Sequence, residues 1–321
     1  MNIPGMGMLR WVGRQVDSVR VPLTHGRLGF VGLMKRTFED LGKDHVGAFA
    51  GALTYSIVFA SLPFLTFLTS LLGLFNARGL VNTMLESIRP ALPQQAYDLI
   101  SGYARQLTAP GNDAAFGVSA LVTLVVSLYG ASGAFRAIMD AMNVMYEVEE
   151  GRPIWKRYLI SMGLALSVVL LLVSAVVLLA AGPLIIGAIA NAVGLGPLFT
   201  TTWSILRWPI LISFVLLAFA LVYYYGPDAE QSFKFLTPGS FIALLLWLLF
   251  SGLFSIYVRN ASFGNWGAVA SIIVLMLYIY WSSYILLLGA EMNQIIEDAS
   301  PEGKDEGDKT SPQKQAQKAT T

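Results

Sequence analysis

The sequence has no cysteine and very little histidine. Its 321 residues include only two histidines, His25 and His45, and both precede the first long apolar run. The lack of cysteine excludes disulfides, thiolate catalysis and Cys-based metal sites. Metal-dependent phosphodiester cleavage needs converging His, Asp and Glu ligands, whereas the acidic residues here are scattered among Lys and Arg. With no Gly-x-Ser-x-Gly elbow either, the sequence predicts no catalytic residue, no metal site and no cofactor, and we do not expect an enzyme.

Charge is scarce as well. Only 13% of the residues are charged and 55% are hydrophobic, whereas a soluble domain has roughly 25% charged residues. The formal net charge of +1 provides no basic field for nucleic acid, and no basic stripe with interleaved aromatic residues is present. We therefore expect membrane lipids as partners and no nucleic acid; a homo-oligomer is left open.

Long apolar runs dominate the chain. The last two of them, Phe235 to Val258 and Asn260 to Ala290, contain no charged residue, and each is long enough to cross the roughly 30 Å hydrocarbon layer as a helix. Similar long apolar runs recur upstream. The sequence thus predicts an all-α polytopic membrane protein whose six transmembrane helices cover residues 46–75, 114–135, 158–181, 208–227, 237–258 and 267–290.

The segments outside these runs are polar. Within the N-terminal segment 1–45, helical spacing relates five apolar residues that would lie in the membrane interface: Leu28, Val31, Met34, Phe38 and Leu41. A plain polar lead-in is the alternative. Residues 76–113 are expected to form two short helices at the outer surface. Residues 294–321 read as a disordered cytoplasmic tail that follows the membrane domain 46–293.

The distribution of Lys and Arg decides the topology. With six spans, 16 of these residues fall on the N-terminal side and 5 on the other; a seventh span at 184–206 changes the division to 13 and 8. The positive-inside rule favours the first arrangement, with both termini cytoplasmic. Residues 184–206, which contain glycines, an asparagine and three threonines, are then expected to be re-entrant or interfacial.

Three stretches carry a resemblance to a known family. They are AGALTYSIVFASLPFL in the first span, GAFRAIMDAMNVMYEVEEGRPIWKR after the second, and the last hairpin with LLWLLFSGLFSIYV, FGNWGA and LLLGAEMN. Residues 35 to 297 resemble the YihY/virulence factor BrkB family, although Tyr55-Ser56 stands where the family often has two tyrosines. The resemblance implies a six-helix, multi-pass protein of the bacterial inner (plasma) membrane. It also brings an old ribonuclease BN label without a defined activity.

A polar stripe marks the end of the second span. Tyr129, Ser132, Arg136, Asp140 and Asn143 recur at spacings of three and four, which places them on one helix face. Arg136 and Asp140 would either close on each other or line a cavity. The planar guanidinium of Arg136 is suited to an anionic headgroup or phosphate. The alternative is that Arg136 only snorkels at the interface and marks the helix end.

Further candidates lie elsewhere along the chain. On the sixth helix, Tyr284 and Glu291 share a face, so that Glu291 would answer a basic group such as Arg136 or serve in structural pairing. The outer end of the last hairpin has four residues that would form a gate or merely a turn and a belt anchor: Arg259, Asn260, Asn265 and Trp266. Interrupted helices can line transport pathways; a kink or break is expected at Pro63, and a break at Gly182 and Pro183.

These features favour transport over catalysis. We expect a transporter or flippase for an anionic or amphipathic substrate, lipid-derived molecules included. Because no ATPase motif is present, an ion gradient, a concentration gradient or a partner would drive it. A non-catalytic membrane scaffold in envelope assembly is the alternative function.

Overall fold

The structure is a computed structural model that describes residues 29–74, 118–180, 196–260 and 267–299, together with isolated positions between 82 and 102. Its elements confirm the all-α prediction. They are α2 (Phe30–Lys43), α3 (Val46–Leu74), α6 (Val118–Met145), α7 (Ile154–Ala180), α9 (Gly196–Tyr225), α10 (Pro238–Asn260) and α11 (Gly267–Asp298).

Five of these helices, namely α3, α7, α9, α10 and α11, are long and apolar enough to cross a membrane. Helix α6 is not among the five; its second half carries Arg136, Asp140 and Asn143. The chain is therefore a membrane protein with several spans. The six-span topology and the cytoplasmic termini stay predictions.

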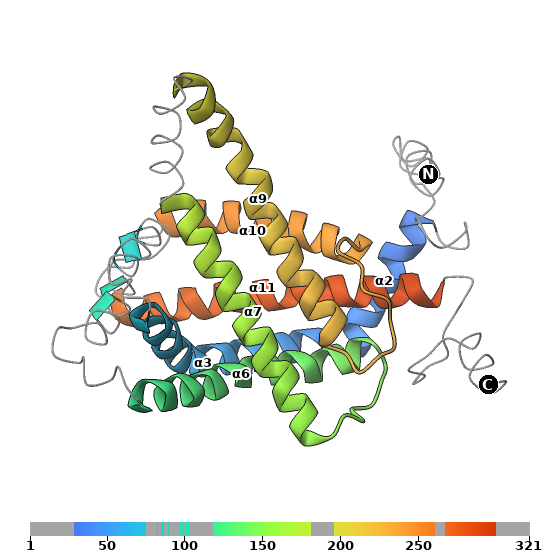
Figure 1. Cartoon of the computed structure of the whole chain (residues 1–321). Helices are drawn as coiled ribbons and strands as arrows, with labels where there is room; N and C mark the ends of the chain where they lie inside the picture. Colours follow the sequence, from blue (N-terminus) through green and yellow to red (C-terminus); the bar gives the residue numbers. More distant parts are fainter. Residues whose placement is uncertain are drawn as a thin grey trace.

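The helices pack around α11, which lies between α10 on one side and α3 on the other, while α6 packs along α3. Helices α7 and α9 cross this layer at a steep angle (Figure 1). The contact between α3 and α6 is close because Gly130 has no side chain: a Cβ there would lie 2.7 Å from the Cβ of Pro63. Small residues at such crossings let membrane helices approach each other.

Helices α10 and α11 also approach each other closely. A Cβ on Gly289 would lie 2.8 Å from the Cβ of Ala243 and 2.9 Å from the carbonyl oxygen of Gly239. The Asn293 side chain then accepts a hydrogen bond from the Gly239 N–H at 2.9 Å, at the first turn of α10. The side chain of one helix thus satisfies a backbone donor that the other helix leaves without an intrahelical partner.

The largest buried cluster lies at one end of the bundle, where α2, the start of α3, the end of α6 and the end of α11 meet; we call this the α2 end (Figure 1). Its fully buried members include Leu33, Val46, Met142, Tyr146 and Met292. Farther along α10 and α11, many large apolar side chains are exposed. Lipid tails are as apolar as a protein core, so this surface suits the membrane interior.

Two helices extend beyond the bounds predicted for the spans. Residues 196–206, expected to be re-entrant or interfacial, form the first turns of α9, and the fourth span continues directly from them. The proline that follows Gly196 is suited to a first helical turn, and no charge interrupts the chain before Arg207. Helix α11 ends at Asp298, so that residues 294–298 belong to a partly buried helix and not to the tail.

One local expectation is also corrected. Helix α3 runs unbroken through Pro63, so the predicted break is absent; membrane helices tolerate proline where neighbouring groups satisfy the backbone. In α2, Leu33, Thr37 and Leu41 form the face buried in the protein, while Val31 and Phe38, two of the residues predicted to lie in the membrane interface, are exposed. The buried face is set by contact with α11. The interfacial position of α2 stays a prediction.

Candidate functional site

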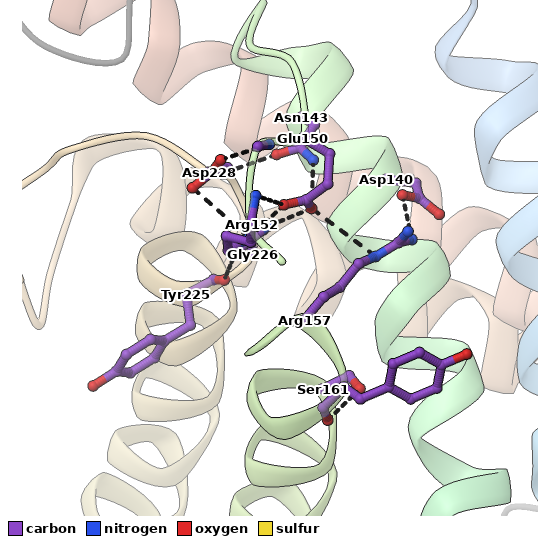
Figure 2. Close-up of polar contacts among 11 residues, drawn as sticks. Asp140, Asn143, Glu150, Arg152, Arg157, Ser161, Tyr225, Gly226 and Asp228 are labelled. Atoms are coloured by element: carbon purple, nitrogen blue, oxygen red, sulfur yellow. Dashed lines mark hydrogen bonds and ion pairs between the residues drawn. The ribbon is translucent and has the colours of Figure 1, made fainter. Parts of the chain in front are cut away.

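A network of polar side chains joins the α6–α7 connection to the α9–α10 connection at the α2 end (Figure 2). At its centre is Arg152, whose side chain is only 5% exposed. Its Nε and Nη2 donate to the two carboxylate oxygens of Glu150, each at 2.7 Å. Nη1 donates to the Tyr225 carbonyl at 3.0 Å, and Nη2 also donates to the Gly226 carbonyl at 2.9 Å. Arg152 therefore binds a carboxylate and the open end of α9 together.

Asn143 completes this loop network from α6. Its Nδ2 donates to Glu150 at 3.0 Å, and its Oδ1 accepts from the backbone N–H of Asp228 at 2.7 Å. The Asp228 carboxylate accepts in turn from the N–H of Gly151 at 2.9 Å. Burial alone would raise the pKa of Glu150, but the hydrogen bonds from Arg152 and Asn143 outweigh burial and lower this pKa to about 2. Glu150 is thus ionised at neutral pH.

The structure separates Arg136 from Asp140. Asp140 forms an ion pair with Arg157 of α7, at 2.5 Å between Oδ1 and Nη2. The predicted i,i+4 pair is therefore not formed, because α7 presents an arginine whose Nη2 lies within hydrogen-bonding distance of this carboxylate. Asn143, predicted on the same stripe, belongs to the loop network.

Arg136 instead lies in a cradle that α6 and α7 build together. Its Nη1 donates to the hydroxyl of Ser132 at 2.6 Å, and its guanidinium carbon lies 5.1 Å from the ring centre of Tyr129 and 4.4 Å from that of Tyr158. The two rings are parallel, with centres 5.5 Å apart. Within the described part of the chain, no carboxylate lies within 4.0 Å of Arg136. We call these four residues the Arg136 cradle.

Glu291 is buried near the end of α11. It is 2% exposed, and its Oε2 has no hydrogen-bond partner. Glu291 does not pair with Arg136, although the sequence allowed this pair. Charged neighbours include Asp44, at the junction of α2 and α3, where burial, with a contribution from Asp40, raises the pKa of Asp44. Tyr284 is half-buried farther along α11 and packs against Trp281, with ring centres 5.7 Å apart.

The outer-gate hypothesis is only partly covered by the described residues. Arg259 and Asn260 are exposed at the end of α10, and the Asn260 side chain donates to the carbonyl of Ile256 at 2.8 Å, as a residue closing a helix can. Four predicted positions cannot be compared, since they lie outside the described residues: Gly182, Pro183, Asn265 and Trp266.

The sequence reading missed the central residues of both sites. It did not single out Glu150 or Arg152, nor Tyr158 as a partner of Arg136. A signal existed in the turn residues Gly151 and Pro153, and in Gly226-Pro227-Asp228, since both loops are short and rich in turn formers. Their contact spans more than 70 residues, which local spacing cannot predict.

A family model described as Virulence factor BrkB matches residues 37–314. The ribonuclease-like protein YfkH of Bacillus subtilis (strain 168) is 29% identical over 250 residues, which cover 76% of this chain and 87% of the relative. A UPF0761 membrane protein of Psychromonas ingrahamii is 25% identical, covering 89% and 92%.

A second UPF0761 membrane protein, from Halorhodospira halophila, is 26% identical over 309 residues. These residues cover 90% of this chain but 62% of that relative, so the chain spans less than two thirds of it. No solved structure matches the chain.

Proposed function

The chain belongs to the virulence factor BrkB family of membrane proteins, and we propose that it is a non-enzymatic transporter or flippase of the bacterial inner membrane whose substrate is an anionic amphiphile. The observation that carries the proposal is the Arg136 cradle. An arginine in an apolar helix bundle is costly unless something answers its charge. Here the nearest carboxylate on the same face is taken by Arg157, which leaves the charge of Arg136 available to a ligand.

The chemistry of the cradle suits a phosphate or carboxylate headgroup. A guanidinium has five N–H donors in a rigid plane, and Ser132 accepts only one of them at hydrogen-bonding distance. The rings of Tyr129 and Tyr158 stabilise the cation through their π faces and hold the plane in position. The remaining donors match the bidentate geometry that anions with two adjacent oxygens require.

An apolar path on α6 leads to this cationic group. Val122, Val125, Val126 and Tyr129 are all exposed, and their spacing of three and four places them on one face of α6. Arg136 follows Tyr129 by seven residues and lies on the same face. The headgroup of an amphiphile held at Arg136 would therefore have its chains against this apolar stripe. A small soluble anion would gain nothing from the stripe, which is why we favour an amphiphile.

Native mass spectrometry of the protein purified in mild detergent tests this proposal. We expect a discrete adduct of lipid mass on the wild type that is lost in Arg136→Ala and weakened in Arg136→Lys, which keeps the charge but not the planar fork. Arg259→Ala is the matched control, because it removes one arginine from the opposite end of a membrane helix and should keep the adduct. If the wild type retains nothing but detergent, lipid translocation is refuted.

Translocation itself is measured in vesicles that contain a labelled anionic phospholipid, by the rate at which the label reaches the opposite leaflet. The wild type should accelerate this step and Arg136→Ala should not. A protein that binds the lipid but leaves the rate at that of empty vesicles is not a flippase. That outcome would favour the scaffold function, in which the lipid is a structural partner.

A further inference from the structure

Glu291 is a buried acid whose carboxylate is not fully hydrogen-bonded. It is 2% exposed, and its Oε2 has no hydrogen-bond partner. The residues that flank it on α11, Leu287, Leu288 and Met292, belong to the main buried cluster. No hydrogen-bond donor among the described residues therefore reaches this oxygen.

The charged groups around Glu291 are acidic. Four acidic groups interact electrostatically with Glu291 and disfavour its charge: Asp40 on α2, Asp44 at the α2–α3 junction, Glu147 just after α6, and Asp298 on α11 itself. The Tyr146 hydroxyl also lies near Glu291 and Glu297. Within the same region Lys43 is engaged by Asp40, at 2.5 Å between Nζ and Oδ1, and its side chain is exposed.

The other helices that pack on α11 contribute no cation there. Helix α3 has no charged residue at all, and α10 carries only Arg259, at its opposite end. The two charged residues of α6 are engaged with α7: Arg136 stacks on Tyr158 and Asp140 pairs with Arg157. An ionised Glu291 would therefore be a buried charge among like charges.

We propose that Glu291 is a proton-binding site and is protonated when α2, α6 and α11 are packed as in this structure. An ionised carboxylate without a partner is strongly disfavoured inside a protein, and nearby acids disfavour it further. Protonation removes the charge and provides an O–H donor. A sodium ion would need several oxygen ligands, and among the described residues no group of three or more acidic or His side chains is placed to hold a metal ion.

This site is placed to couple a proton to movement. Release of the proton puts a negative charge where α2 and the end of α6 contact α11. Repulsion between this charge and Asp44 and Glu147 then favours the separation of α2 and the end of α6 from α11. Two residues to either side of Glu291, Gly289 and Asn293 contact the start of α10, so a shift of this end of α11 reaches the last hairpin. The further step, that the proton bound at Glu291 is the coupling ion for translocation, rests on the proposed function above.

Infrared spectroscopy of the full-length protein tests the proton site without any substrate. The C=O stretch of a protonated carboxyl is separate from the bands of carboxylates and amides, and it shifts in heavy water. We expect such a band in the wild type at pH 7 and its loss in Glu291→Gln. Glu149→Gln, an exposed acid near the same end of the bundle, should keep the band.

A wild type without this band at pH 7 refutes the proposal, whether or not Glu291→Gln folds. A band that persists in Glu291→Gln assigns the proton to another residue and refutes it equally. If the band is absent and sodium chloride, but not choline chloride, stabilises the wild type and not Glu291→Gln, the carboxylate binds sodium and not a proton.

The coupling is tested separately in the labelled-lipid vesicles. A pH gradient should change the wild-type translocation rate, and Glu291→Gln should lose this response while it keeps the lipid adduct at Arg136. Failure of the adduct concerns the Arg136 cradle and leaves the infrared result standing. An unchanged response in Glu291→Gln would refute the coupling.

Discussion

Arg152→Ala should be among the most destabilising substitutions outside the membrane interior. It removes four side-chain hydrogen bonds, two to Glu150 and two to the carbonyls of Tyr225 and Gly226. Removal of one partner of a buried ion pair costs about 3–5 kcal/mol, because the other charge stays buried. The Glu150 side chain is 20% exposed and gains some solvation from water. We therefore expect the free energy of unfolding to fall by about 3 kcal/mol, near the lower end of this range.

The pH dependence provides a second signature. The pKa of Glu150 falls from 4.5 to about 2 in the folded protein. A lowered carboxyl pKa stabilises the folded state above the unfolded pKa, and this contribution disappears as the pH falls through the folded pKa. The difference in unfolding free energy between wild type and Arg152→Ala should therefore be full at pH 6 and shrink between about pH 4.5 and 2.

The free energies are measured by SDS titration of the purified protein in mixed micelles. Lys35→Ala is the matched control: its pair with Glu39 is 3.8 Å long and exposed on both sides, and such pairs contribute less than about 1 kcal/mol. Arg152→Lys should fall between the two, since an ammonium cannot reproduce the fork. A loss in Arg152→Ala no larger than in Lys35→Ala would show that the loop network does not hold the two connections together.

Three further substitutions test the packing by the same titration. Gly289→Ala should cost about 1–3 kcal/mol through overpacking against α10, whereas Gly252→Ala, with nothing within 4 Å of the added Cβ, should be neutral or stabilising; equal effects would contradict the close α10–α11 contact. Gly130→Ala should be destabilising, and Pro63→Gly, which removes the Cβ and Cγ that the added methyl would meet, should relieve part of that loss in the double mutant; strict additivity would refute their contact. Asn143→Ala should cost about 1–3 kcal/mol, because it leaves Glu150 and a backbone N–H with fewer partners; an unchanged stability would show that the amide is dispensable.

The membrane character and the helices could be read from local sequence. A charge-free run of 20 or more residues has one stable solution in lipid, because only a helix satisfies its own backbone there. The runs around α3, α7, α10 and α11 were therefore predicted with their approximate bounds. Boundaries failed where polarity was a poor guide: α9 begins at Gly196 in spite of its threonines, and α11 continues to Asp298 because its last turns pack against α2.

Local sequence is enough to identify a helical membrane protein and to mark Arg136 and Glu291 as unusual in their surroundings. The partners of the charged groups follow from the packing of the helices: Asp140 pairs with Arg157, Arg136 contacts two tyrosine rings, and Glu291 Oε2 has no hydrogen-bond donor. The physical reason is that lipid is as apolar as a protein core, so the hydrophobic pattern does not reveal which face of a helix is turned inward. The rotation of each helix about its own axis, together with contacts between loops distant in sequence, sets the partners of the polar side chains.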